Sequence, residues 1–250
     1  MVSKTVLGLF TAGAVAAEPA TMLAALRAAI GDDGTLMAPT YTYDNRVFHP
    51  DTTPGRTGAL SEALRLLPGA IRSWHPTHSV AAHGPDAAVL CADHHLVAAT
   101  DVASPLGRLA EAQGRVLLVG VGHVADSSVH VGEFLADAPY LDIPVDPSRP
   151  RELTIHVGTE QYRYAPVRFS GCSKAFGAVE WPLRARGAVR DAFVGRALAQ
   201  LVDGKDVVEA TASAVRADPT CLLCTDPACY RCTHARARLS EPTLPADGRA

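Results

Sequence analysis

The sequence has no excess of positive charge. Its 23 lysine and arginine residues are outnumbered by 26 acidic residues, which leaves a formal net charge of -3 at pH 7. A nucleic-acid-binding domain needs a basic stripe or patch, so we exclude nucleic acid as a partner. A slightly acidic chain is compatible with a polycationic substrate, although so small a charge decides little.

Long apolar runs are missing as well. No stretch approaches the roughly eighteen residues that a membrane-spanning helix requires, so we expect no membrane association. The first residues, MVSKTVLGLFTAGAVAAEPA, imitate a signal peptide, with one lysine, an apolar stretch and an alanine-rich end. The strictly apolar run is short, however, because Thr11, Gly13 and Glu18 interrupt it. We therefore interpret Thr5–Phe10 as a first strand and expect a cytoplasmic protein.

Cysteine is scarce, and four of the six cysteines are crowded into CLLCTDPACYRCTH, as Cys221, Cys224, Cys229 and Cys232. Two C-x2-C pairs in an intracellular protein indicate a metal more than disulfides, because each pair brings two thiolates to one tetrahedral ion. We predict a structural zinc site in a Cys-rich tail, residues 217–236. The spacer between the pairs is short for a zinc ribbon, so Cys172 or His234 could replace one thiol. The alternatives are a metal-free reduced tail and, less favoured, an iron–sulfur cluster.

Short apolar strands alternate with amphipathic helices along most of the chain, which is typical of an α/β fold. Beyond Pro139 the sequence alternates apolar and polar residues between turn residues, which predicts an antiparallel hairpin. We predict a single domain over residues 1–250, with a central mixed sheet flanked by helices, this hairpin region and the Cys-rich tail. The expected elements are strands at Thr5–Phe10, Thr35–Pro39 and Val116–Val119, helices at Pro19–Ile30, Gly58–Leu67, Asp101–Leu109 and Ala188–Leu201, and a short element at Lys205–Val215.

The most informative stretch is RVLLVGVGHVADSSVHVGE, residues 115–133. Its apolar start predicts a buried strand, which the glycines end, and the polar ADSS segment offers N-cap residues for a following helix. His130 and Glu133 are then three residues apart, which places both side chains on one face of the first helical turn. Open α/β sheets tend to bind ligands at this carboxyl edge.

Two interpretations of His130 and Glu133 remain open on spacing alone. The pair is compatible with an ordinary helix start, where the macrodipole favours an acid and the histidine lies on the surface. The functional interpretation rests on context. Histidine is the usual general base near neutral pH, and a glycine-rich turn offers backbone N–H groups to an oxyanion.

The same stretch resembles a known family. GVGHVADSSVHVGE is similar to the GVGHDxNTxLHLAE segment of the aminoglycoside 3-N-acetyltransferases, antibiotic acetyltransferases that use acetyl-CoA. Three further blocks of that family occur in the same order: GDDGTLMAPTYTYDNRVFHP, GALSEALRLLPGAIRSWHPTHSVAAHGP and ASPLGRLAEAQGRVLLVGVGH. Several ordered motifs together make a specific signal, which covers roughly residues 30–140 closely and the remainder loosely.

The resemblance implies an N-acyltransferase that moves an acetyl group from acetyl-CoA directly to an amine, with His130 as general base. Glu133 or Asp44 would orient that base, although an Asp-Asn pair is also ordinary turn chemistry. The cofactor-binding residues that it implies are Thr11, Thr77, His78, Ser79, Ser127 and Ser128. The HPTHS segment could instead be a polar loop held by Pro76. We do not interpret the nearby histidines as a metal site, because no acid or cysteine stands at ligand spacing.

The chain departs from the family pattern in two places. A leader helix that usually precedes the first strand is absent, and Arg168 stands about where the family has an acid near the acceptor. A cation there would repel the ammonium groups of an aminoglycoside, so a biosynthetic acyltransferase with a less basic acceptor is an alternative. Another is a non-catalytic zinc-binding module on this scaffold. The expected partners are a small amine and CoA, and the sequence leaves a homodimer open.

Overall fold

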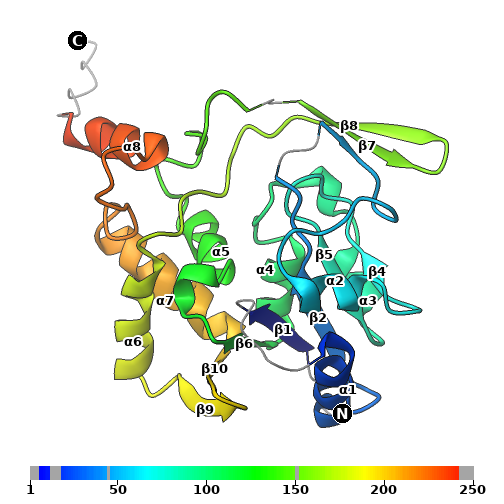
Figure 1. Cartoon of the computed structure of the whole chain (residues 1–250). Helices are drawn as coiled ribbons and strands as arrows, with labels where there is room; N and C mark the ends of the chain where they lie inside the picture. The colour runs from blue at the N-terminus through cyan, green and yellow to red at the C-terminus, as the bar shows by residue number, and fades with distance from the viewer. Residues whose placement is uncertain (1–5, 12–17, 44–45, 150–151, 242–250) are drawn as a thin grey trace.

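The structure, a computed structural model, describes residues 6–11, 18–43, 46–149 and 152–241 (Figure 1). Its α/β class confirms the sequence prediction: a seven-stranded mixed sheet carries helices on both faces, and a three-stranded sheet lies apart from it. The larger sheet has the order β4-β5-β2-β1-β6-β10-β9, with strands at Ile71–Arg72, Val80–His83, Thr35–Pro39, Val6–Thr11, Arg115–Val119, Ala197–Asp203 and Arg190–Val194.

Three parallel strands form the centre of this sheet. Strand β1 pairs in parallel with β2 on one side and with β6 on the other, while the outer strands are antiparallel to their neighbours. The carboxyl ends of the three parallel strands therefore meet at one edge. In an open sheet such an edge is where ligands bind, and here the chain continues from it into the loops after β2 and β6.

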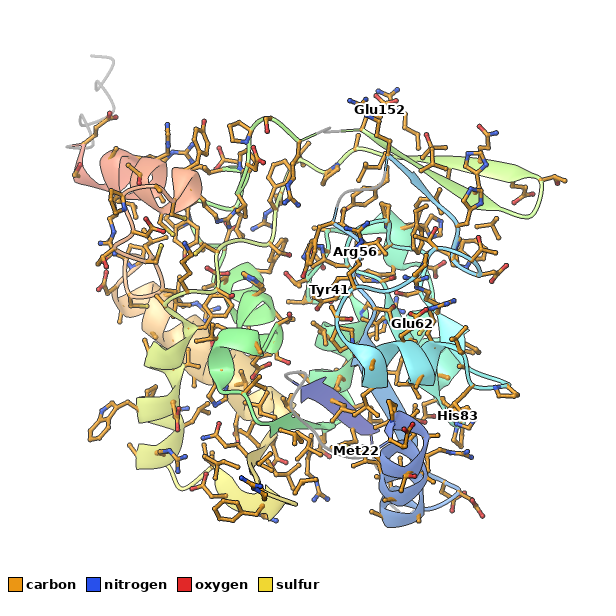
Figure 2. All side chains as sticks on the ribbon, in the orientation of Figure 1. Met22, Tyr41, Arg56, Glu62, His83 and Glu152 are labelled. Atoms are coloured by element: carbon orange, nitrogen blue, oxygen red, sulfur yellow. The ribbon has the colours of Figure 1, made fainter. Side chains whose placement is uncertain are left out.

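Side chains that alternate along the strands divide the core into two clusters. Met22 of α1 packs on one face with Leu7 and Leu36, whereas Tyr41 belongs to the cluster on the other face with Val6 and Met37 (both Met22 and Tyr41 are labelled in Figure 2). Because neighbouring residues of a strand point to opposite faces, a buried strand must be apolar on both, as β2 is.

The helices predicted at Pro19–Ile30, Gly58–Leu67 and Asp101–Leu109 are present, and their ends lie within four residues of the predicted ones. Ser104 caps one of them by accepting a hydrogen bond from the Gly107 N–H at 3.3 Å, and a proline follows at the first helical position, as the sequence predicts. The α-helices are α1 Pro19–Ile30, α2 Ala59–Arg65, α3 Ala87–Cys91, α4 Pro105–Glu111, α5 Ser128–Leu135, α6 Glu180–Ala185, α7 Gly204–Ala217 and α8 Tyr230–Ser240. Three 3-10 turns are η1 His94–Leu96, η2 His123–Ala125 and η3 Phe176–Val179.

The expected antiparallel hairpin is also present. Strands β7 (Leu153–Val157) and β8 (Glu160–Tyr164) pair with each other, and β3 (Val47–Phe48) adds to β7 in parallel. Phe48, Ile155 and Tyr164 form a small core of their own. This sheet and α8 lie at the end of the molecule opposite α1 (Figure 1).

The helix expected over Ala188–Leu201 is wrong. The segment forms β9 and β10, which pair antiparallel around Gly195 with a positive φ of 60°, and β10 continues the sheet beside β6. Its alanines and leucines favour a helix locally, but the free edge of β6 supplies a ladder of backbone hydrogen bonds that no local pattern reveals. In the described part of the chain, no helix is long and apolar enough to cross a membrane.

Candidate functional site

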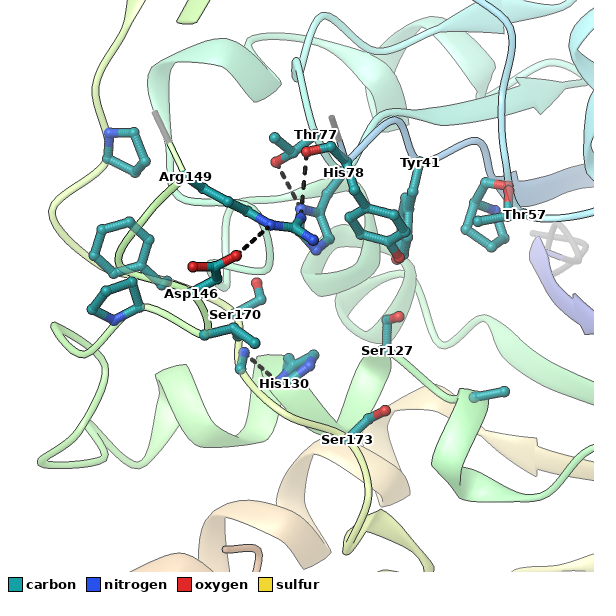
Figure 3. Close-up of a pocket in the computed structure, with 18 of the residues that line it drawn as sticks. Tyr41, Thr57, Thr77, His78, Ser127, His130, Asp146, Arg149, Ser170 and Ser173 are labelled. Carbon is teal, nitrogen blue, oxygen red and sulfur yellow. Dashed lines mark hydrogen bonds and ion pairs between the residues drawn. The ribbon is translucent and has the colours of Figure 1, made fainter. Parts of the chain in front are cut away.

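A cavity of about 740 Å³ opens at the carboxyl edge of the parallel strands (Figure 3). The loop after β2 supplies Tyr41, and the segment between β6 and α5 supplies Ser127. Thr77 and His78 line it from the segment before β5, and the stretch 166–173 closes the side next to His130. Its volume lies within the usual range for small-molecule and cofactor sites.

His130 and Glu133 form a buried pair at the wall of this cavity. The His130 Nδ1 and the Glu133 Oε2 are 2.5 Å apart, both side chains are less than a tenth exposed, and His130 faces the cavity while Glu133 lies behind it. The helical spacing is what brings them together. With Nδ1 bonded to the carboxylate, Nε2 is the ring nitrogen of His130 that does not contact Glu133.

Two further residues hold the pair in place. The Tyr140 hydroxyl donates to the other Glu133 oxygen, Oε1, at 3.0 Å, and Phe176 packs edge-on against the His130 ring at 4.5 Å between centroids. A carboxylate that accepts from a tyrosine and from an imidazole N–H is satisfied as an anion. The carboxylate thus fixes the tautomer in which Nδ1 carries the proton.

The turn before α5 places only one of its two serines at the cavity. Ser127 lines the cavity, but Ser128 is buried behind it and its hydroxyl has no hydrogen-bond partner in the described part of the structure. Asp126 organises the turn, since its Oδ1 accepts the Ser128 N–H at 2.9 Å and its Oδ2 pairs with the Nδ1 of His123 at 3.0 Å. Of the two serines, Ser127 is therefore the one that can contact a ligand in the cavity.

In the HPTHS segment, residues 75–79, likewise only some of the predicted residues line the cavity. Thr77 and His78 line the cavity and bond to each other at 2.8 Å between Oγ1 and Nδ1. Ser79 is fully buried, and its hydroxyl bonds to the Thr40 carbonyl and the Arg72 guanidinium instead. Burial lowers the pKa of His78 to about 3, and the neighbouring His130 adds to the effect. His78 is therefore neutral at ordinary pH and serves the cavity as a hydrogen-bonding group.

Two predicted residues are not placed by the structure. Asp44 lies outside the described residues, and so does the Thr11–Gly13 turn beyond the backbone of Thr11, which ends β1. Their roles remain predictions.

Arg168 is not among the residues that line the cavity. Its guanidinium pairs with Asp137 at 2.5 Å and lies over the Phe134 ring at 5.0 Å, whereas its chain neighbours from Phe169 to Gly171 line the cavity. The Arg168 charge is thus paired with Asp137 outside the cavity lining, which weakens the repulsion expected between Arg168 and a cationic substrate.

The cysteines converge, but with a different fourth member. The sulfur atoms of four cysteines lie within 4.8 Å of one another, and they belong to Cys172, Cys224, Cys229 and Cys232. Cys221 stands outside the group, and the His234 ring bonds to the Tyr230 carbonyl through Nδ1. The expected set is thus corrected by one thiol: Cys172, which the sequence left open as a replacement, takes the place of Cys221, because the tail folds back on the loop after β8.

Sequence reasoning missed three residues around the pair. Tyr140 follows Glu133 by seven residues, Gly171 lies one residue before Cys172, and Arg231 lies between two tail cysteines. Only Tyr140 could have been suspected from the sequence, because it lies so soon after Glu133. Gly171 and Arg231 are far from residues 130–133 in the sequence, so nothing there relates them to the pair.

Sequence comparison links this architecture to known proteins. The sequence model described as aminoglycoside 3-N-acetyltransferase matches residues 8–216. The aminoglycoside N(3)-acetyltransferase IV of Salmonella sp is 32% identical over 208 residues, which cover 82% of this chain and 77% of that protein.

Solved structures agree with the sequence comparison. Aminoglycoside acetyltransferase AAC(3)-IVa, crystallised as a histidine-to-alanine mutant in complex with a gentamicin, superimposes with a TM-score of 0.81 at 30% identity, covering 93% of this chain and 90% of that one. The binary complex of AAC-IIIb with CoASH gives a TM-score of 0.70 at 25% identity, covering 86% of this chain and 90% of that one.

Proposed function

This chain belongs to the aminoglycoside 3-N-acetyltransferase family, and from that premise we propose that it transfers the acetyl group of acetyl-CoA to an amine of an aminoglycoside. The observation that carries the proposal is the buried His130–Glu133 pair at the wall of a 740 Å³ cavity. The relative that binds a gentamicin and the one that binds CoASH supply the two substrate classes.

His130 acts as the general base in this proposal. Its Nε2 removes a proton from the acceptor amine while the amine nitrogen attacks the thioester carbonyl. Glu133 holds the Nδ1 proton and stabilises the imidazolium that forms. The amine gains the acetyl group, the carbon–sulfur bond breaks, and the thiolate of CoA leaves with the electron pair and takes up the proton from His130.

The cavity also offers hydrogen-bond donors for the carbonyl oxygen as it becomes negative. Ser127 and Ser173 both line the cavity near His130 (Figure 3), and hydroxyls aimed at a developing oxyanion stabilise the tetrahedral intermediate. Of the acidic groups at the cavity, Asp126 is buried and bonded within the turn, so the carboxylate that can meet a cationic acceptor is Asp146, which is partly exposed and pairs with Arg149 at 3.6 Å.

The test is thiol release from acetyl-CoA with a 2-deoxystreptamine aminoglycoside, followed by NMR of the product to locate the new amide. We expect one thiol released per acetylated molecule, with the amide on the 3-amino group. Thiol release that does not depend on the aminoglycoside, or a product acetylated on oxygen, would contradict the proposal.

We also propose that the four converging thiols hold a structural zinc ion. The Cys172 and Cys224 sulfurs are 3.7 Å apart, which matches the separation of about 3.8 Å between sulfurs bound to one tetrahedral zinc. Backbone N–H groups of Lys174 and Cys224 point at cluster sulfurs, at 3.5 and 3.3 Å, and such bonds stabilise thiolates.

Cys221 provides a matched control for this zinc site. We expect one zinc per chain by elemental analysis, loss of that zinc in Cys172→Ser, and full zinc content in Cys221→Ser. Zinc lost from Cys221→Ser but retained in Cys172→Ser would contradict the assignment, as would purified chain without metal after expression with zinc.

A further inference from the structure

Two residues behind the active site are in unusually close contact. The Arg231 side chain passes so near to Gly171 that a Cβ atom on that glycine would lie 2.3 Å from the Arg231 Nε. No side chain larger than hydrogen fits there without a shift. Gly171 in turn lines the cavity, and its backbone nitrogen lies 3.4 Å from His130 Nδ1. The contact therefore bears directly on the wall next to His130.

Arg231 also reaches the carboxylate side of the pair. It is only 1% exposed, and its guanidinium lies 5.4 Å from the centroid of the Tyr140 ring, whose hydroxyl bonds to Glu133. One guanidinium nitrogen bonds to the Ile143 carbonyl, and Nη2 has no hydrogen-bond partner in the described residues. Hydrogen bonding thus accounts for only part of this buried cation, and its cation–π contact with the Tyr140 ring adds a further attraction on the Glu133 side.

Both members of the contact are chain neighbours of cluster thiols. Gly171 precedes Cys172, and Arg231 precedes Cys232. The two cysteines come from segments 60 residues apart, the loop after β8 and helix α8, and the four-thiol cluster is where these segments meet. A metal that binds both sulfurs fixes the distance between the two backbones, and with it the fit of Arg231 over Gly171.

We propose that the cysteine site positions the catalytic pair: zinc held by Cys172 and Cys232 clamps Gly171 against Arg231, and these two set the orientation of His130 and Glu133. Arg231 is then a positioning residue, which acts through Tyr140 and Glu133 and touches no substrate. This inference rests on the proposed acetyl transfer and on the proposed zinc.

The first test compares two arginines of the same helix. We expect Arg231→Met to keep its zinc and its KM for acetyl-CoA while kcat falls about 10- to 100-fold, the usual effect of misplacing a catalytic group by a fraction of an ångström or more. Arg238→Met is the control, because Arg238 pairs with Asp142 at the surface, at 2.6 Å, and should leave kcat unchanged. Should Arg231→Met not fold, Gly171→Ala tests the same contact from the other side.

The second test measures the environment of the His130 ring by NMR and does not depend on enzyme activity. In protein labelled with 15N-histidine, the ring resonances of His130 are assigned by their loss in His130→Asn. We expect them to shift when zinc is removed by a chelator and in Arg231→Met, and to stay in place in Arg238→Met. Circular dichroism and a cooperative melt establish that each sample is folded.

The outcomes separate this inference from the proposed function. Unchanged His130 resonances and unchanged kcat in folded, zinc-free protein would overturn the inference, as would wild-type kcat in Arg231→Met. If the wild type acetylates no aminoglycoside, the proposed function fails, and the resonances of His130 still decide whether the metal site positions it.

Discussion

Tyr140 donates its hydroxyl hydrogen bond to the buried carboxylate of Glu133 at 3.0 Å, on the oxygen that His130 does not use. Burial, with the neighbouring carboxylate, raises the pKa of Tyr140 far above its ordinary value, so the hydroxyl remains a donor at every working pH. Both Glu133 oxygens therefore have partners, and the side chain cannot rotate away from His130 without losing one of them.

Removal of that donor should weaken both the site and the fold. We expect Tyr140→Phe to lower kcat about tenfold and the free energy of unfolding by about 1–3 kcal/mol, because a buried carboxylate oxygen loses its partner. Steady-state kinetics and urea unfolding measure the two effects. Wild-type values for both would show that the bond does not hold Glu133.

The charge of Glu133 should matter more than its shape. Glu133→Gln keeps the size of the side chain but cannot stabilise an imidazolium, so we expect kcat to fall on the order of 10²-fold. The KM for acetyl-CoA should change little, since Glu133 lies behind His130. If kcat/KM fell to the same extent through a higher KM, with kcat unchanged, Glu133 would act in substrate binding instead.

Arg168 should be neutral for substrate selection. It lies outside the cavity in an exposed ion pair with Asp137, and such pairs contribute below about 1 kcal/mol. We expect Arg168→Glu to change the KM for an aminoglycoside less than about threefold. Asp146→Lys, which puts a cation into the cavity, should raise that KM further than Arg168→Glu does. The reverse order would return Arg168 to the acceptor site.

Stability should fall in mild acid because His75 and His94, like His78, have pKa values that burial lowers. Burial lowers the pKa of His94 to about 3 and that of His75 well below its ordinary 6.5. The unfolded chain then binds more protons than the folded one below pH 6.5, so their contribution is complete above that pH and is lost as pH falls toward 3. Each histidine contributes a slope of up to about 1.4 kcal/mol per pH unit.

Urea unfolding at pH 7.5 and pH 5 measures this dependence. His94→Gln should be less stable at both values, since it loses the bonds from Ser73 and to Ala99, but it should show a smaller difference between them. An unfolding free energy equal at the two pH values in the wild type would contradict the assignment of neutral buried histidines.

Local patterns sufficed where the signal is local. The helix Pro19–Ile30 and the strand Thr35–Pro39 have the predicted bounds, because a proline, a glycine and an uninterrupted apolar run mark them. The same holds for His130 and Glu133, whose spacing on one helical turn fixes their proximity whatever the rest of the chain does.

The predictions were wrong or incomplete where a structure depends on contacts between segments far apart in the sequence. Ala188–Leu201 became two strands because β6 offers its edge from about eighty residues earlier in the chain. Cys172 could be named from the sequence only as one of two possible replacements, because no spacing rule relates residues 172 and 224 and only the fold brings the loop after β8 to the tail. Arg231 contacts Tyr140 and Gly171 because the tail folds back beside the cavity, and this contact between distant segments is likewise not visible in the sequence. Each of these needs the topology, which a single sequence does not state.

The most direct test of the central claim is the activity of His130→Asn, with binding measured beside it. Calorimetry should show that the variant still binds CoA and an aminoglycoside, because the substitution leaves most of the cavity lining in place, while kcat for acetyl transfer falls on the order of 10²- to 10⁴-fold. A variant that binds both substrates and turns over at the wild-type rate would contradict the assignment of His130 as the base.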